Sequence, residues 1–446
     1  MKKIISLALV STMTLSLLTG CGGKETTIDV SDTTDSIKQE VVLPEINASE
    51  IRNDGLSSEI DAGNAELGDD KVNITDIGNG SIINPDNRHI YNGGTWYYDQ
   101  LNDVEKNAYK TIKNSLETAA GKKEDLLVFL DITDEIQMLK VYRAVLEDNP
   151  QILIQNIGSG EIEKLYDGGN EPSGISFKLS FDKYWSDVNV EVAQEELEKE
   201  IKKIMKQMDN IDGDYNKVLW LYNYLINSIE YNLDVPWHPT MYGALVMKEC
   251  ACEGISEAFE YILNLYGIKT IGVGGLSGFV FDGVPNIDGH KWNMVMLDGE
   301  WYAFDVTWDI DKDLSKFLPY TYFAVNQEDI SYAHAPFFPE MVPEATGTKY
   351  NYYEYNNLIV EKYNIEELIR VGKACYTLNP GYFSFKFKNA YDFTKAINSS
   401  EYNQWIPKVI QANKLTKWQY LIRYNPDLHI VEFAIFDSYQ DPKDYQ

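Results

Sequence analysis

The sequence predicts an α+β protein whose central part is a helix packed on an antiparallel sheet. After Cys252, apolar residues recur at helical spacing over several turns. Two β-like runs, 290–297 and 300–307, flank Asp298-Gly299, which is a strong signal for a two-residue hairpin. Helical windows dominate before this region, and a mixture of helix and strand follows it. The sequence therefore predicts a helical N-terminal region, a central core and a small C-terminal α+β module.

The first residues have the pattern of an export signal. Lys2-Lys3 form a basic start, and Ile4 to Leu18 form an apolar stretch that is too short for a comfortable transmembrane helix. The following Leu18-Thr19-Gly20-Cys21 resembles a bacterial lipoprotein signal, so we expect residues 1–20 to be a signal peptide. The resemblance implies lipid on Cys21 and a protein anchored to the outer face of the bacterial cell membrane. An ordinary signal peptide with a coincidental cysteine is the alternative.

The next part of the chain changes from a tether to a folded region. Residues 21–88 are rich in Gly, Ser, Thr, Asn, Asp and Glu, which predicts a flexible acidic tether. Residues 89–210 are predicted to be mostly helical, and Asn102-Asp103-Val104-Glu105 resembles a capping box at the first helix. The other elements expected up to the start of the core are helices at 134–146, 190–208 and 215–230 and a strand at 175–185.

The last two regions are the core, 211–345, and the C-terminal module, 346–446. Cys375 falls on the apolar face of a helix in the module and is expected to be core. The module has no obvious catalytic constellation, so packing or partner binding is its natural role. Its expected elements are helices at 365–376 and 390–412, a strand at 382–388, and a hairpin of 418–423 with 429–436.

Cys252, His290 and Asp305 have the residue types of a nucleophile, a base and an orienting group. Cys252 falls at or just before a helix N-terminus, where the helix dipole favours thiolate over thiol. Taken singly, each residue has a plainer interpretation, as a buried small hydrophobe, a packed strand histidine and a turn aspartate. The case for catalysis rests on all three together.

The hairpin register relates His290 to Asp305. With a two-residue turn at Asp298-Gly299, Trp292 lies opposite Asp305. His290 and Asp305 are then diagonal neighbours on one face of the hairpin, within reach of long side chains. A turn one residue longer would place them on opposite faces.

Four segments carry a resemblance to a known family. They are Cys252-Glu253-Gly254, His290-Lys291-Trp292-Asn293, Trp301 to Trp308 and the lead-in Tyr242-Gly243-Ala244-Leu245. In their order along the chain, with the lead-in first, they resemble the core of the transglutaminase-like family, within the papain-like cysteine-enzyme class, over roughly residues 215–330. The resemblance implies a papain/transglutaminase-like fold and catalytic roles for the cysteine, the histidine and the aspartate of the third segment, Asp305.

Other residues of this region are candidates for lesser roles. Trp292, Tyr242 and Trp237 are candidate substrate contacts or oxyanion donors, and packing is the alternative for each. Ser256 and Lys291 depart from residues common at these positions in bacterial members, which could alter the wall of the site.

Charge and metal-ligand spacing limit the partners. The net charge of −30 makes nucleic-acid binding unlikely, and the chain has no zinc-ligand spacing. The series Asp309-x-Asp311-x-Asp313 could bind calcium, but a solvated acidic loop is favoured. His334 follows in a predicted loop, where a single histidine indicates little. We therefore expect no metal and no cofactor.

The sequence thus predicts a surface-anchored cysteine enzyme that cleaves or transfers acyl groups of amide bonds through a Cys252 thioester. Its expected substrate is a protein or peptide, and hydrolysis is favoured over transfer because water is always present. The alternative is a non-catalytic cell-surface binding lipoprotein that retains the fold. A solute-binding lipoprotein would need repeated βαβ patterns, which the sequence does not show.

Overall fold

The protein is described from a computed structural model, in which the contacts of the chain form two units, one up to Leu358 and one from Ile359. The signal peptide, Cys21 and nearly all of the tether lie outside the described residues. These residues are 82–83, 90–91, 95–122, 125–152, 162–167, 169–179, 190–281, 284–310, 319–415 and 419–436.

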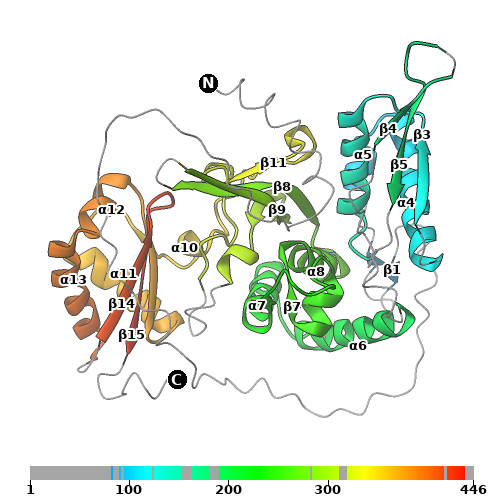
Figure 1. The fold of residues 1–446 in the computed structure, drawn as a ribbon. Helices are drawn as coiled ribbons and strands as arrows, with labels where there is room; N and C mark the ends of the chain where they lie inside the picture. The colour runs from blue at the N-terminus through cyan, green and yellow to red at the C-terminus, as the bar shows by residue number, and fades with distance from the viewer. Residues whose placement is uncertain are drawn as a thin grey trace. The chain divides into compact units, whose positions relative to one another are not determined.

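The N-terminal region of the first unit pairs helices with a small sheet (Figure 1). The capping box is confirmed, because the backbone N–H of Glu105 donates to the Asn102 side chain and that of Asn102 donates to the Glu105 carboxylate. The strand expected at 175–185 is confirmed as far as Leu179, and residues 180–185 lie outside the described residues. The strands β3 and β4 were not anticipated. The elements are β1 (Ile82–Ile83), β2 (Ile90–Tyr91), α3 (Trp96–Asp99), α4 (Asp103–Lys122), β3 (Leu126–Leu130), α5 (Glu135–Asp148), β4 (Glu163–Leu165) and β5 (Gly174–Leu179).

Two helices lead into the core and confirm the expected positions. They are α6 (Val190–Met208) and α7 (Asp214–Ser228). A short parallel pair, β6 (Glu230–Tyr231) with β7 (Glu249–Cys250), encloses the π-helix η3 (Gly243–Met247). The chain then enters α8 (Cys252–Leu265), all of whose residues are buried. This helix is the centre of the unit.

The central sheet has the strand order β10-β9-β8-β11, and all its pairings are antiparallel. The long strands β8 (Thr270–Phe281) and β9 (Val284–Leu297) pack against α8 (Figure 1). The expected α+β fold, a nucleophile helix on an antiparallel sheet, is confirmed. The edge strands are β10 (Glu300–Phe304) and β11 (His334–Pro336).

The hairpin between β9 and β10 has the predicted register. Leu297 pairs with Glu300, and the pairing continues in step to Asn293 with Phe304. Both turn residues have positive φ, 51° at Asp298 and 85° at Gly299. These are the backbone angles of the two-residue turn that Asp-Gly favours.

Short elements complete the first unit after β10. They are η4 (Thr307–Asp309), α9 (Gln327–Ile330), η5 (Pro339–Met341) and α10 (Tyr352–Tyr355). Of these, α9 leads into β11 and η5 follows it, so this stretch adds the fourth strand to the sheet.

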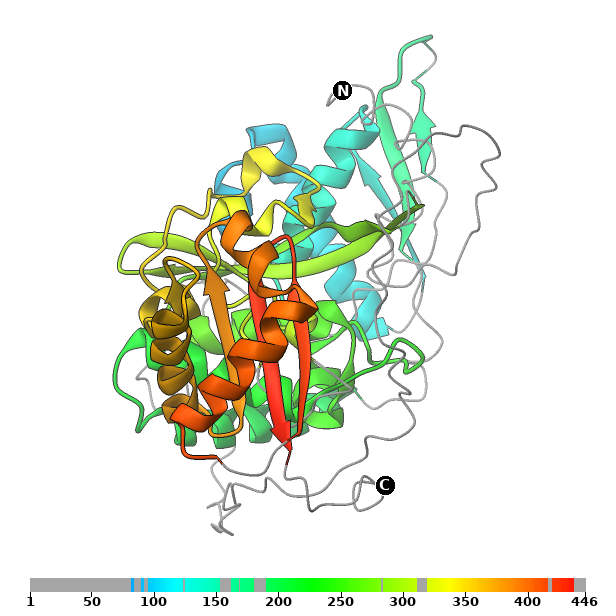
Figure 2. The same cartoon turned by 90° about the vertical axis from the view of Figure 1, so that its left-hand side faces the viewer.

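The second unit is a four-stranded sheet of order β12-β13-β15-β14 with helices on it (Figure 2). The helix expected at 390–412 is wrong as a single element, because Asn398 caps a new helix with its side chain on Ser400. The other expected elements are confirmed. The elements are β12 (Ile359–Val360), α11 (Ile365–Leu378), β13 (Tyr382–Phe387), α12 (Ala390–Ala396), α13 (Ser399–Ala412), β14 (Gln419–Asn425) and β15 (Ile430–Phe436).

Aromatic packing joins the helices of the second unit to its sheet. Trp405 of α13 packs on Phe385 of β13, with ring centroids 5.9 Å apart. Cys375 is 3% exposed and donates to the Ser384 carbonyl, so its predicted place in the core is confirmed. Among the described residues, no helix is both long and apolar enough to cross a membrane.

Candidate active site

Cys252 is the first residue of α8, as the sequence predicted. A loop holds this helix start in place, because the backbone N–H of Ala251 donates to the His238 carbonyl at 2.8 Å. Gly254 allows the approach, since a Cβ there would collide with the Thr240 carbonyl. Cys252 has no exposed surface, and its sulfur is in a disulfide in this structure. A thiolate here therefore belongs to the reduced protein.

His290 and Asp305 form a buried pair. His290 Nε2 lies 2.6 Å from Asp305 Oδ2, and the two residues are 7% and 0% exposed. The histidine charge and hydrogen bond hold the pKa of Asp305 well below its usual value, against the effect of burial. The predicted register thus brings together His290 and Asp305, the expected base and orienting group, and we call these two residues the dyad.

His334 is a second histidine on the same carboxylate. Its Nε2 lies 2.8 Å from Asp305 Oδ2, and its side chain is fully buried. From the sequence, a position near the cleft was the most that could be said of this single histidine, because it lies 29 residues beyond Asp305 in a stretch without periodicity. Pairing of β11 with β8, with His334 opposite Ser277, brings it to the dyad. Only this tertiary pairing could have revealed it.

Aromatic rings surround the two histidines. Trp308 lies 5.8 Å from the His290 ring and 4.6 Å from the His334 ring, between centroids. Trp292 stacks towards His290 at 6.3 Å and meets His334 edge-on at 5.1 Å. These rings shield the dyad from solvent, and hydrogen bonds are electrostatically stronger in such low-dielectric surroundings.

The start of α8 is tied to the dyad strand. Ser256, one turn after Cys252, donates its hydroxyl to the Trp292 carbonyl at 3.1 Å. Asn293 returns a hydrogen bond from its amide to the Ser256 carbonyl at 3.0 Å. The departure from the family pattern at Ser256 therefore fastens the nucleophile helix to β9.

Tyr231 adds a shared neighbour for the cysteine and the dyad. It packs against Cys252. Burial, followed by the charges of Asp288 and Asp305, raises the pKa of Tyr231 to about 12. Tyr231 thus contacts Cys252 and lies within range of the Asp305 charge, so Cys252 and Asp305 lie in the same part of the core.

The other two candidate contacts lie in different surroundings. Trp237 is half-buried, and its indole Nε1 is buried without a hydrogen-bond partner in the described part of the chain. It belongs to the loop that holds the start of α8. The Tyr242 hydroxyl donates instead to Glu196 of α6 at 2.8 Å. Of the two, Trp237 keeps an unused buried donor, whereas the Tyr242 hydroxyl is engaged with Glu196.

The expectation of a solvated loop at Asp309 is wrong. Asp309 is 1% exposed, and its carboxylate accepts from the Tyr222 hydroxyl at 2.6 Å and from the Tyr322 backbone at 3.0 Å. The same Tyr222 hydroxyl also reaches the Asp305 carbonyl at 3.1 Å. Asp309 thus braces the turn after the dyad, while Asp311 and Asp313 lie outside the described residues.

Lys291 points away from the dyad, as strand alternation requires. Its ammonium lies 3.0 Å from Glu147 of α5 and 3.6 Å from Glu257 of α8, and Lys291 is 3% exposed. Gly272 makes room on the neighbouring strand, because a Cβ there would lie 2.8 Å from Glu147 and 2.9 Å from Glu260. The second departure from the family pattern therefore fills a buried ionic cluster.

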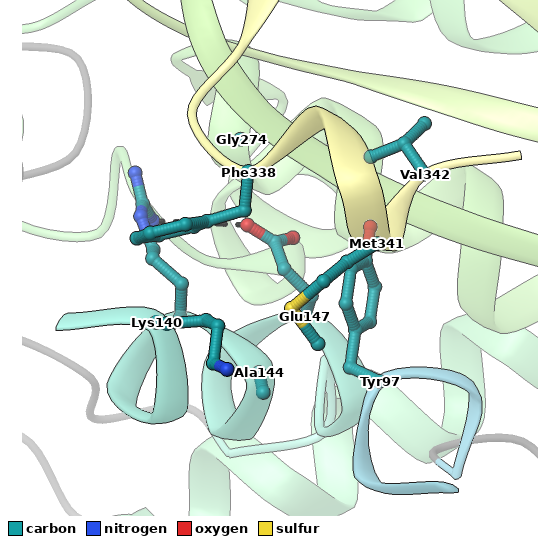
Figure 3. A pocket seen from close by; sticks show the side chains of 9 residues that line it. Tyr97, Lys140, Ala144, Glu147, Gly274, Phe338, Met341 and Val342 are labelled. Carbon is teal, nitrogen blue, oxygen red and sulfur yellow. Dashed lines mark ion pairs between the residues drawn. The ribbon is translucent and has the colours of Figure 1, made fainter. Parts of the chain in front are cut away.

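Lys291, Glu147 and the charged residues near them form a buried group that we call the α5 charge cluster. Burial raises the pKa values of Glu257 and Glu260 well above the usual value, so both carboxyls favour the protonated form. The Glu147 carboxylate points into a pocket with an empty volume of about 270 Å³, part of it open to solvent (Figure 3). The members of the cluster are Arg143, Glu147, Glu253, Glu257, Glu260 and Lys291.

The two histidines on Asp305 Oδ2 have the geometry of hydrogen bonding. Among the described residues, His290, Asp305 and His334 form the one group of three or more His, Cys, Asp or Glu side chains whose potential metal-ligand atoms lie within 4.8 Å of one another. Two ligands of tetrahedral zinc stay about 3.3 Å apart, given metal–ligand distances near 2.0–2.1 Å. The observed 2.6 and 2.8 Å are shorter, and both ring nitrogens aim at one oxygen.

Comparison with known proteins finds one family model that matches part of the chain. Residues 202–306 match the model of the Transglutaminase-like superfamily. No curated protein sequence matches the chain.

Several solved structures are similar in part. A protein of Cytophaga hutchinsonii described as a candidate cysteine protease is 13% identical, with 41% of this chain and 65% of that chain covered and a TM-score of 0.21. A structure described as a TGase is 16% identical, with coverage of 42% and 52% and a TM-score of 0.23. The periplasmic domain of TgpA from Pseudomonas aeruginosa, bound to ethylmercury, is 14% identical, with coverage of 33% and 62% and a TM-score of 0.22. This chain spans less than two thirds of each.

A cysteine at the start of a helix, packed on an antiparallel sheet that carries a buried His–Asp pair, is the arrangement of a papain/transglutaminase-like fold. Within that fold class, the chain contains a transglutaminase-like domain. The match and the site together support a cysteine-dependent enzyme.

Proposed function

We propose that this chain is a cell-surface cysteine enzyme that cleaves or transfers acyl groups of amide bonds through a thioester at Cys252. The observation that carries the proposal is the buried 2.6 Å bond between His290 Nε2 and Asp305 Oδ2. An ionised carboxylate keeps a proton on Nε2 and leaves Nδ1 as the basic nitrogen. A pure binding protein has no need of this arrangement beside a cysteine.

The chemistry would run in two steps. His290 Nδ1 takes the thiol proton, and the Cys252 thiolate attacks the amide carbonyl carbon. The C–N bond breaks as the imidazolium returns that proton to the leaving amine. Water or a second amine then attacks the thioester, loses its proton to His290 and releases the acid or a new amide, with the thiol restored.

Nearby indoles would assist the reaction. Trp237 Nε1, buried and lacking a partner in the described chain, could donate to the oxyanion, together with the backbone N–H of Cys252. Trp292 would form the wall beside the imidazole. We favour a protein or peptide substrate and hydrolysis over transfer, because water is the acceptor that is always present.

Thiol labelling tests the nucleophile. The mature chain, residues 21–446 with Cys21→Ser, is reduced, freed of reductant and treated with one equivalent of iodoacetamide at pH 7. We expect the adduct on Cys252, because the helix start and His290 favour its thiolate. Burial raises the pKa of Cys375 to about 12 and raises that of Cys250 as well, so both should react slowly. Peptide mass mapping locates the adduct.

His290→Ala is the matched control. It should slow Cys252 labelling by about tenfold or more, equivalent to at least one pKa unit of lost thiolate stabilisation. Equal and slow labelling of the three cysteines in the unaltered chain would contradict the enzyme and favour the binding lipoprotein. A fluorescent primary amine with a glutamine-rich protein then separates the acceptors, because transfer fixes the label and hydrolysis does not.

The proposal places the enzyme on the outer face of the cell membrane, held by lipid on Cys21. Its support is the resemblance of Leu18-Thr19-Gly20-Cys21 to a lipoprotein signal. In a bacterial host, the unaltered chain should fractionate with membranes, and Cys21→Ser should move it to the soluble fraction or retain the uncleaved leader. Equal membrane association and processing of both chains would count against a lipid anchor.

A further inference from the structure

We propose that His334 is a positioning residue for the dyad, donating a second ring N–H to Asp305 and limiting how strongly that carboxylate raises the basicity of His290. Its catalytic consequence rests on the proposed function, whereas its effect on the dyad does not. The starting point is the shared oxygen, since both Nε2 atoms lie within 2.8 Å of Asp305 Oδ2.

The direction of the His334 hydrogen bond follows from charge. The histidine contacts hold the pKa of Asp305 low, so its carboxylate is ionised and can only accept. Burial lowers the pKa of His334, which favours the neutral ring. Its Nδ1 has a contact with the Ile330 backbone carbonyl, but this contact falls short of hydrogen-bond geometry. The single proton of a neutral His334 is therefore placed on Nε2, where the stronger acceptor, the Asp305 carboxylate, lies at 2.8 Å.

Two donors on one oxygen share its negative charge. A hydrogen bond to the charged form of a carboxylate stabilises that form and weakens its pull on other donors. His334 therefore offsets part of the stabilisation that Asp305 gives to imidazolium His290. The ring contacts to Trp308, Trp292 and Tyr322, at 4.6, 5.1 and 5.4 Å, keep the second imidazole in place.

The carboxylate is also fixed on its other side. Asp305 Oδ1 accepts from the Trp308 backbone N–H at 3.1 Å, so the two oxygens have separate roles. The other titratable groups around this carboxyl lie on different elements and stay the same in the variants below. They are Tyr222 and Asp309 beneath the Asp305 backbone, Tyr231 with Asp288 towards the cysteine, and Tyr322 against His334.

Histidine NMR tests the proposal without a substrate. The chain contains five histidines, so ¹⁵N-histidine labelling gives a spectrum that single variants can assign. The reduced mature chain carries Cys252→Ser, which removes coupling to the thiolate. In it, His334 should show a protonated Nε2 and an unprotonated Nδ1. An Nδ1–H tautomer of neutral His334 at pH 7 would overturn the proposal directly, because Nε2 could then not donate to Asp305.

Two substitutions separate hydrogen bonding from packing. His334→Leu removes the donor, and we expect the His290 pKa to rise by about half a unit to one unit, because a hydrogen bond to a charged group is lost. His334→Gln offers an amide N–H near the same place and should restore the His290 pKa. An unchanged His290 pKa in His334→Leu, or equal shifts in both variants, would refute the positioning role. If His334→Leu does not fold, the tautomer in the unaltered ring still decides.

Activity adds a separate readout if the enzyme is confirmed. In the dependence of kcat on pH, one limb reports the ionisation of His290. The pKa of that limb should rise in His334→Leu, with KM little changed, and should return to its original value in His334→Gln. Failure of Cys252 labelling would sink the proposed function and leave the NMR result standing. Failure of the NMR result would sink only the role of His334.

Discussion

Asp148, at the end of α5, is a buried carboxyl whose protonation should be visible in stability. It is 2% exposed and accepts from the backbone N–H groups of Tyr97 and Tyr98 at 3.1 and 2.8 Å. Burial raises its pKa to about 7, the nearby charge of Glu147 adds to this, and the hydrogen bonds oppose it. The folded chain therefore holds a proton that the unfolded chain releases near pH 4.

This difference gives a signed prediction. Because the folded pKa is raised, the contribution of Asp148 is fully present below about pH 4 and is lost as the pH rises towards 7. In the unaltered chain, Asp148 should lower the unfolding free energy by on the order of a few kcal/mol as the pH rises over this range. Asp148→Asn should remove this decrease. Urea unfolding at several pH values measures it. The exposed Asp131→Asn is the control, and identical slopes for Asp148→Asn and the unaltered chain would contradict the assignment.

At the same scale, the sequence predicted two thirds of the arrangement around Asp305 Oδ2. His290 and Asp305 could be related because both lie within counting distance of one turn, and register follows from turn length. His334 could not, because its place depends on which edge of β8 the distant β11 joins. Local periodicity carries no information about that choice.

The β9–β10 hairpin is the element on which the dyad depends. Its two-residue turn fixes the register over the whole paired length, from Leu297–Glu300 to Asn293–Phe304. Side-chain direction alternates along each strand, so a shift of one residue reverses the face on which Asp305 lies.

One inserted residue should therefore separate the dyad. A glycine added after Gly299 is expected to slip β10 against β9 and turn Asp305 away from His290. The fast labelling of Cys252 at neutral pH should then fall towards that of the His290→Ala variant. Asp298→Asn is the control, since Asn also accepts positive φ in such turns. Undiminished labelling in the inserted chain would show that the dyad does not depend on this register.

Elements missed by the sequence have physical reasons. β8 carries Gly272, Gly274 and Gly275, and glycine weakens a strand pattern. The same absence of side chains lets the strand lie against the α5 charge cluster, where a Cβ on Gly272 or Gly274 would meet Glu147 at 2.8 or 2.7 Å. The glycines that weaken the strand pattern in the sequence are thus the residues that the packing of β8 requires.

For the first unit as a whole, the N-terminal region is part of the core. The expectation of a mostly helical region at 89–210 followed composition, which cannot show long-range ion pairs. Arg143 of α5 lies 3.9 Å from Glu253, next to Cys252, and Glu147 lies 3.0 Å from Lys291, next to His290. The α5 charge cluster therefore touches the sequence neighbours of both the nucleophile and the base.

The α5 charge cluster has a consequence for how such a domain could be passed between proteins. The segment recognisable by sequence, 202–306, contains Glu253, Glu257, Glu260 and Lys291 but neither Arg143 nor Glu147. Transplanted alone, it would keep the Lys291–Glu257 pair but lose Glu147 at 3.0 Å from Lys291 and Arg143 at 3.9 Å from Glu253, and losing one partner of a buried ion pair is costly. The segment that must be transferred together is therefore longer than the segment that the family model matches. A recombined chain would have to include α5 or replace these four residues.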